Sequence, residues 1–209
     1  MEDLIRGLAQ FKTTVFPELS GLFQELAYVQ SPTTLFIACS DSRVVPELLT
    51  QQQPGRLFVV RNAGNIVPSY GPEPGGVSAA IEYAVAVLGV KDIVICGHSN
   101  CGAMSAIAMA ETVAHLPAVA AWLRHADAAK AVNATGVYET AQERVEELVR
   151  QNVKVQLNNI RTHPSVAVAL ETERIALHGW VYDIETGRVD ILNYETGRFE
   201  ALDPKQFCG

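Results

Sequence analysis

The sequence predicts an α/β protein with a short central β-sheet that is mostly parallel and has an antiparallel edge, flanked by helices. Three short apolar runs, 34–39, 57–60 and 93–96, have the length and composition of buried strands. A helical segment, 77–88, lies between the second and third runs, and the order strand–helix–strand favours a parallel sheet. Near the C-terminus, two strand-like runs flank the turn 185–187, which indicates the antiparallel edge.

Periodic apolar residues predict the helices. Residues 2–29 carry two amphipathic stripes, and Pro17 is expected to divide them into two helices. No strand precedes these helices, so we expect an N-terminal helical arm, 1–30, with a neighbouring subunit as one surface that it could cover. Segment 77–88 is apolar on every side, so we expect deep burial, with a subunit interface as one place for it. The other expected elements are helices at 102–110, 117–132 and 138–162, strands at 175–182 and 188–193, and a second Glu-Thr-Gly turn at 195–197 that completes a small meander.

The composition indicates a single globular domain over residues 1–209. Hydrophobic residues make up 48% and charged residues 19% of the chain, which is enough to build a core. The net charge of −7, without a long run of Lys or Arg, argues against nucleic acid and anionic membranes as partners. No segment reaches the roughly 20 apolar residues that span a bilayer. The start Met1-Glu2-Asp3 has no signal-peptide pattern, so we expect a cytoplasmic protein.

Cysteine and histidine residues stand where two predicted strands end. Cys39 opens a Cys-Ser-Asp-Ser-Arg motif, and His98 and Cys101 belong to a Gly-His-Ser-Asn-Cys-Gly motif that begins at Gly97. Sites in parallel sheets form at the carboxyl ends of strands, so the two motifs can share one ion. Two thiolates and one imidazole suit Zn²⁺, and three protein ligands leave a fourth position open, as in catalytic sites. Spacing alone leaves Cys96 open as an alternative ligand to Cys39.

Asp41 and Arg43 provide a second signal. Residues two apart in an extended segment project to one side, so the carboxylate and the guanidinium can form a bidentate pair. Beside a metal, Arg43 would keep Asp41 ionised and away from the ion, and Asp41 could accept a hydrogen bond from metal-bound water. The alternative is an ordinary surface ion pair of little energetic value. The Arg-Asn-Ala-Gly-Asn segment at 61–65 is likewise open as a simple polar turn.

Two other protein classes remain open on these residues. A thiol redox or sensor protein would use Cys96 and Cys101, act without metal and contain a thiol of low pKa. A non-enzymatic module would use zinc only to stabilise its fold. The remaining histidines are expected to be structural and Cys208 to be incidental; these histidines are His115, His125, His163 and His178.

The three polar motifs, at 39–43, 61–65 and 97–102, together resemble those of the bacterial β-class carbonic anhydrases, in particular the members encoded together with cyanase. The similarity extends from the N-terminal helices to a Leu-His-Gly-Trp-Val-Tyr-Asp motif at 177–183. The resemblance implies a zinc lyase with one Zn²⁺ per chain. Such an enzyme reversibly hydrates CO₂ to bicarbonate and a proton, through attack of zinc-bound hydroxide on CO₂.

The resemblance also implies individual roles. The family's zinc ligands fall on Cys39, His98 and Cys101, and its Asp–Arg dyad falls on Asp41 and Arg43. The substrate-binding residues match Gln30, Phe58, Tyr83 and Gly102, the last through its backbone N–H. In the family, the first three of these reach the zinc of the partner subunit, so the resemblance implies a homodimer or a dimer of dimers.

Some family members close the site by letting the dyad aspartate bind zinc, and they hold bicarbonate at a regulatory site made of Trp, Arg and Tyr. Here Phe36 stands at the Trp position, while Arg61 and Tyr182 match. Gln30 and Tyr83 favour the type that stays open.

Overall fold

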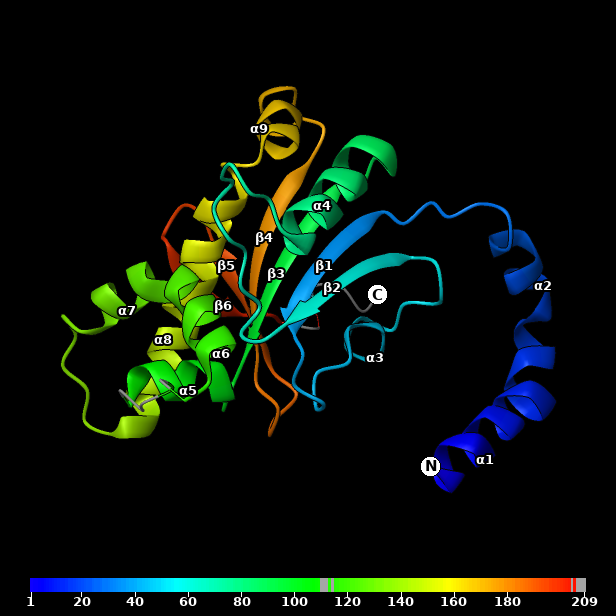
Figure 1. The fold of residues 1–209 in the computed structure, drawn as a ribbon, viewed down its shortest axis with the longest axis horizontal. Coiled ribbons are helices and arrows are strands. Elements are labelled where there is room, and N and C mark those ends of the chain that lie inside the picture. The colour runs from blue at the N-terminus through cyan, green and yellow to red at the C-terminus, as the bar shows by residue number, and fades with distance from the viewer. Residues whose placement is uncertain (110–112, 114, 204, 206–209) are drawn as a thin grey trace. The chain divides into compact units, whose positions relative to one another are not determined.

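The computed structural model describes residues 1–109, 113, 115–203 and 205. These residues form two compact units, Met1–Ser31 and Pro32–Gly209. The larger unit contains the sheet, and both Cys/His motifs lie within it (Figure 1).

A six-stranded sheet runs through the larger unit in the order β2-β1-β3-β4-β5-β6. The pairs β2–β1, β1–β3 and β3–β4 are parallel, and the pairs β4–β5 and β5–β6 are antiparallel. This arrangement confirms the predicted parallel sheet with an antiparallel edge. The strands are β1 (Thr34–Cys39), β2 (Leu57–Asn62), β3 (Asp92–His98), β4 (Ala176–Tyr182), β5 (Val189–Asn193) and β6 (Arg198–Ala201).

In the larger unit, helices connect the strands and flank the sheet, and two further helices belong to the smaller unit (Figure 1). Within the described residues, none of them is both long and apolar enough to cross a bilayer. Their bounds are α1 (Glu2–Gln10), α2 (Phe16–Leu26), α3 (Pro46–Thr50), α4 (Gly76–Glu82), α5 (Gly102–Ala108), α6 (Pro117–Leu123), α7 (Asp127–Asn133), α8 (Ala141–Ile160) and α9 (Pro164–Glu171).

Helices α3 and α9 are absent from the sequence-based prediction. Helix α3 has five residues, too few to show apolar periodicity, and α9 follows α8 after three residues. The prediction of one helix over 117–132 was wrong. A 3₁₀ turn over Arg124–Ala126 separates α6 from α7, because the buried Ala126 leaves the helical region at φ −106° and ψ 8°. The expected end of α5 at residue 110 lies outside the described residues.

The N-terminal arm is one uninterrupted helical run, so the prediction that Pro17 separates two helices was wrong. A π-helical turn over Phe11–Val15 joins α1 to α2, with the N–H of Phe16 bonded to the carbonyl of Phe11. This wider turn lies just before Pro17, and proline lacks the N–H that an ordinary helical turn would use. Every arm residue from Met1 to Ser31 is exposed or half-buried, including Leu4 and Leu8.

The main core of the larger unit lies between the sheet and α8. Two strand glycines, Gly97 in β3 and Gly179 in β4, allow this helix to approach closely. A Cβ at Gly97 would stand 2.9 Å from Val149 and Val153, and one at Gly179 would stand 2.8 Å from Leu157. Because α8 also carries polar side chains towards the functional site, this contact fixes their position relative to the strands.

In the single chain, the apolar segment 77–88 is buried on one side only, and its burial in a subunit interface stays a prediction. The segment forms α4 and a following π-helical turn over Tyr83–Val87. Ile81 and Ala84 are fully buried, whereas Tyr83 is 42% and Val87 65% exposed. One small sheet cannot cover all sides of this helix.

The contact between β4 and α8 gives a prediction for stability. Gly179→Ala should lower the free energy of unfolding by about 1–3 kcal/mol, because the added methyl group must displace Leu157 and Val153 in a packed core. Chemical denaturation with a constant m value measures this change. Ala167→Ser, which adds one atom at an exposed position of α9, serves as the control and should stay within about 0.5 kcal/mol of the wild type. Equal stabilities for Gly179→Ala and the wild type would contradict the close packing.

Candidate metal centre and its surroundings

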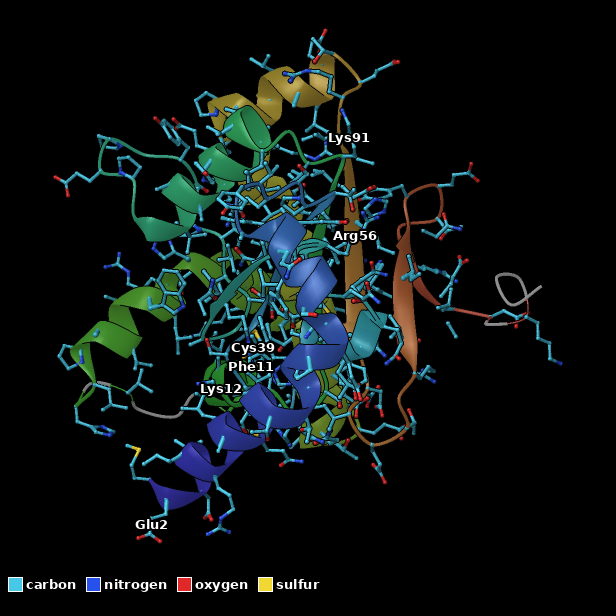
Figure 2. All side chains as sticks on the ribbon, turned by 90° about the vertical axis from the view of Figure 1, so that its right-hand side faces the viewer. Glu2, Phe11, Lys12, Cys39, Arg56 and Lys91 are labelled. Atoms are coloured by element: carbon cyan, nitrogen blue, oxygen red, sulfur yellow. The ribbon has the colours of Figure 1, made fainter. Side chains whose placement is uncertain are left out.

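The parallel pairing of β1 with β3 brings two strand ends together. The register places Ala38 beside Cys96, so Cys39 and His98 both lie at the carboxyl edge of the sheet. Lys91 precedes β3 at the other edge, and Figure 2 shows Cys39 and Lys91 at opposite ends of the sheet. Cys101 follows His98 after a tight turn in which Asn100 adopts a positive φ of 53°. The turn directs the chain back towards Cys39, and α5 begins at Gly102.

Cys39, His98 and Cys101 form a compact group of possible metal ligands. One ligand atom from each residue lies within 4.8 Å of the other two. His98 is fully buried, Cys101 is 1% exposed and Cys39 is 6% exposed. The structure therefore brings together the three residues that the resemblance assigns as ligands.

The hydrogen bonding of His98 fits a metal ligand. Its Nδ1 lies 2.8 Å from the carbonyl oxygen of Ser99, which can only accept, so Nδ1 carries the proton. The buried Nε2 then has a free lone pair and no hydrogen-bond partner. An unpartnered buried nitrogen is costly unless it binds something, and a neutral imidazole held through its other nitrogen is the usual form of a zinc ligand.

The two thiols interact strongly. A hydrogen bond from the Cys101 thiol, together with the one from the Gly64 N–H, lowers the pKa of Cys39 below its ordinary value despite burial, which raises it. The same hydrogen bond, together with burial, raises the pKa of Cys101. A divalent cation bound by both sulfur atoms would hold them as thiolates.

Cys96 belongs to a different environment. It is fully buried with Phe36, Ala38 and Val94, in a small apolar cluster separate from the core that contains Cys39 and Cys101. Burial raises the pKa of its thiol to about 12. Such a thiol is a poor metal ligand and a poor nucleophile. Cys208, the fourth cysteine, lies outside the described residues.

Asp41 and Arg43 form the predicted bidentate pair beside the group. Arg43 Nε lies 2.9 Å from Asp41 Oδ1, and Arg43 Nη2 lies 2.7 Å from Asp41 Oδ2. These hydrogen bonds hold the pKa of the Asp41 carboxyl well below its usual range. Asp41 Oδ2 is 3.9 Å from His98 Nε2, so a carboxylate that remains ionised stands next to the ligand atoms. Arg43 also donates to the carbonyl oxygen of Asn100, at 3.1 Å, which ties the two motifs together.

The segment 61–65 surrounds Cys39 and is more than a polar turn. Arg61 donates to the carbonyl oxygens of Cys39 and Asp41, at 3.1 and 2.7 Å. The backbone N–H of Gly64 donates to Cys39 Sγ at 3.3 Å. Sequence reasoning did not assign a role to Gly64. Its positive φ of 79° and the positive φ of 47° at Asn65 are the relevant signal, because Gly and Asn are the residues that tolerate such backbone.

Phe58 and Tyr83, two of the residues matched to the substrate pocket, lie apart from the metal centre within one chain. Phe58 and Tyr83 are in contact, with ring centroids 6.0 Å apart. Cys39 pairs with Asn62, and Phe58 lies four residues earlier in β2, about 13 Å along the strand. Gln30 belongs to the other compact unit. Gly102 alone among them is adjacent to a ligand, at the first residue of α5.

Comparisons with known proteins agree with this geometry. Residues 34–189 match the family model of carbonic anhydrase. The chain is 61% identical to a carbonic anhydrase of Pseudomonas aeruginosa, over 97% of this chain and 92% of that protein. It is 58% identical to carbonic anhydrase 1 of Escherichia coli O157:H7, with the same two coverages.

Solved structures extend the likeness to the fold. The β-carbonic anhydrase CcaA aligns with a TM-score of 0.92 and 40% identity, covering 97% of this chain and 99% of that one. A tetrameric β-carbonic anhydrase of Sordaria macrospora aligns with a TM-score of 0.81 and 30% identity, covering 92% and 98%. With these matches over nearly the whole chain, the protein belongs to the carbonic anhydrase family of enzymes, in its β class.

Proposed function

We propose that this enzyme binds one Zn²⁺ per chain through Cys39, His98 and Cys101 and catalyses the reversible hydration of CO₂ to bicarbonate and a proton. The buried, unpartnered Nε2 of His98 beside the buried thiols of Cys39 and Cys101 is the observation that carries the proposal. Two thiolates and one imidazole match the ligand preference of zinc and leave one position open. Family membership supports the reaction.

When bound, Zn²⁺ supplies a Lewis acid that makes water nucleophilic near neutral pH, a chemistry for which the three-histidine carbonic anhydrases are the standard example. In the proposal, Asp41 orients the nucleophile. As a carboxylate, it accepts a hydrogen bond from the attacking water and directs the nucleophile towards CO₂. Arg43 occupies both carboxylate oxygens, which keeps Asp41 ionised and off the metal. Because Asp41 is held in this way, we favour the type of site that stays open, in which the aspartate does not bind zinc.

Substrate binding is proposed to involve two chains. Phe58 and Tyr83 offer an apolar wall for CO₂, Gln30 offers an amide, and the N–H of Gly102 would bind a bicarbonate oxygen. Because Phe58 lies far from Cys39 in its own chain, we propose that the first three act on the partner's metal in a homodimer, or in a dimer of dimers. The exposed apolar side of α4 and the exposed apolar residues of the arm support association. We also propose that the enzyme works in the cytoplasm, where its buried ligand thiols remain reduced.

The two rival functions fit the geometry less well. A redox protein that uses Cys96 and Cys101 would require a reactive thiol, yet burial raises the pKa of Cys96 to about 12. A purely structural zinc site would normally have four protein ligands, whereas Cys39, His98 and Cys101 provide three. Zinc analysis and stopped-flow CO₂ hydration, before and after removal of the metal with a chelator, separate the three functions. The proposal expects activity only with metal.

The ligand set can be tested with two cysteine variants. Cys39→Ser should lower the zinc content well below the wild-type value of about one per chain, because serine is not a thiolate ligand at neutral pH. Cys96→Ser should retain the zinc, because that side chain belongs to another cluster. Elemental analysis of both purified proteins measures the difference. Full zinc in Cys39→Ser, with loss of zinc in Cys96→Ser, would replace Cys39 by Cys96 in the ligand set.

The role of Asp41 can be separated from metal binding. Asp41→Asn should keep its zinc and lose about 10²-fold or more in kcat for CO₂ hydration. A neutral amide cannot accept a hydrogen bond from the attacking water and orient that water as the carboxylate does. Asp127→Asn, an exposed carboxylate at the start of α7, is the control and should leave kcat unchanged. An Asp41→Asn enzyme with wild-type turnover would remove Asp41 from the mechanism.

A site shared by two chains predicts complementation. Asp41→Asn and Tyr83→Ala homodimers should each have low activity, and mixing them under conditions of subunit exchange should restore part of it. In a mixed dimer, one site receives Asp41 from one chain and Tyr83 from the other. Stopped-flow CO₂ hydration measures the recovery, and mass spectrometry of intact dimers verifies exchange. If exchange occurs and activity stays at the level of the separate variants, each site belongs to one chain.

A further inference from the structure

Helix α8 carries a row of amide side chains on its inner side. Asn152, Gln156 and Asn159 are spaced four and three residues apart, so they lie on one face of the helix. Asn152 is 1% exposed and Gln156 is fully buried. Val153 and Leu157 lie between them and are buried too, so these amides occupy positions that apolar side chains would ordinarily take. Buried amides are retained in a core only when their hydrogen bonds are satisfied.

The amides are linked to one another. Gln156 Nε2 donates to Asn152 Oδ1 at 2.8 Å, and Asn159 Nδ2 donates to Gln156 Oε1 at 3.1 Å. Each amide therefore fixes the orientation of the next, and we call this row the amide ladder. A connected buried network of this kind holds its members in a single arrangement.

Most outward bonds of the amide ladder reach the segment after β2, and one, from Gln156 Nε2, goes to the carbonyl oxygen of His125 at 3.3 Å. Asn152 Nδ2 donates to the carbonyl oxygen of Gly64 at 3.0 Å. Gln156 Oε1 accepts the N–H of Val67 at 2.9 Å, and Asn159 Nδ2 donates to the carbonyl oxygen of Val67 at 2.9 Å. The ladder thus holds both ends of the stretch from Gly64 to Val67.

Gly64 connects this stretch to the metal centre. Its N–H donates to Cys39 Sγ at 3.3 Å, while its carbonyl oxygen is held by Asn152. The backbone here has a positive φ of 79°, which L side chains rarely adopt, and a Cβ would stand 3.0 Å from Met104 and 3.1 Å from Ala103. Bonds on both sides of the same residue leave the Gly64 N–H little freedom to turn away from the sulfur.

We propose that the amide ladder is a positioning device for the metal centre, which holds the Gly64 N–H on the sulfur of Cys39 and so sets how strongly this thiolate donates to the metal. An N–H that donates to a thiolate withdraws electron density from sulfur. It also keeps the sulfur in place before the metal arrives, and both effects tune metal binding. The inference rests on the proposed zinc site. Asn152, Gln156 and Asn159 act through Gly64 and do not touch the substrate.

The obvious alternative is that the amide ladder only supports the fold. In that case, removing an amide would destabilise the protein and leave the metal centre unchanged once folded. A positioning role makes a different prediction, because the bond between Gly64 and Cys39 would weaken. The sulfur would then be placed less firmly before the metal arrives, so the affinity for metal would fall, and its electrons would be held less tightly, so the charge-transfer band would move to lower energy.

The experiment compares three variants of the full chain with the wild type. Asn152→Leu removes the contact with Gly64 while it keeps a side chain of similar size. Gln156→Met removes the middle of the ladder and provides a second variant if the first folds poorly. Asn158→Leu changes an exposed amide of the same helix and serves as the control. Zinc affinity is measured by competition with a chromophoric chelator. The sulfur-to-metal charge-transfer band is measured after substitution with Co²⁺, and the melting temperature of the metal-free protein reports on the fold.

We expect Asn152→Leu and Gln156→Met to raise the zinc dissociation constant by about 10-fold and to move the Co²⁺ charge-transfer band to longer wavelength. Asn158→Leu should match the wild type in both. If the two ladder variants lower only the melting temperature, with wild-type affinity and band position, the ladder is structural and the inference is wrong. A wild-type protein that binds neither Zn²⁺ nor Co²⁺ would instead overturn the proposed function, and the inference with it.

Discussion

The register between the parallel strands β1 and β3 is the constraint on which the rest of the site depends. It places Cys39 and His98 at the same edge of the sheet, and the turn at Asn100 returns Cys101 to them. The three side chains are almost fully buried, and His98 Nε2 has no hydrogen-bond partner. Burying such groups costs free energy unless an ion binds them. The sheet therefore creates a position with three soft or borderline donors, and zinc is the ion that these donors suit.

Two further layers of hydrogen bonds surround this position. Arg43 holds Asp41 through both carboxylate oxygens and reaches across to the carbonyl of Asn100, so one guanidinium connects the two motifs. On the other side, the Gly64 N–H contacts Cys39, and Asn152 of α8 holds Gly64. Helix α8 can do so because Gly97 and Gly179 let it lie close to the strands. Packing of the core and geometry of the metal centre are thus linked through one helix.

The strands and the turns of the antiparallel edge depend on the local sequence pattern, and they were predicted from the sequence. Short apolar runs gave the strands, and the repeated Glu-Thr-Gly turns indicated the antiparallel edge. The choice between Cys39 and Cys96 could not be made from spacing, and only the family resemblance pointed to Cys39. In the structure, β3 continues beyond Cys96 to His98, which leaves Cys96 within the strand among Phe36 and Val94. The amide ladder was missed because its partners, Gly64 and Val67, lie almost 90 residues away in the chain. Tyr83 and Val87 are exposed in the single chain, and the expected burial of the helical segment 77–88 in a subunit interface stays a prediction.

The most direct test of the account is X-ray absorption at the zinc edge of the purified wild-type protein. Three protein ligands from Cys39, His98 and Cys101 predict two sulfur atoms at about 2.3 Å and one nitrogen at about 2.0 Å. A fourth, light scatterer at about 2.0–2.2 Å would complete a tetrahedron with a position available for chemistry. Four protein ligands, a single sulfur, or a protein purified without zinc and unable to take it up would contradict the proposed catalytic metal centre.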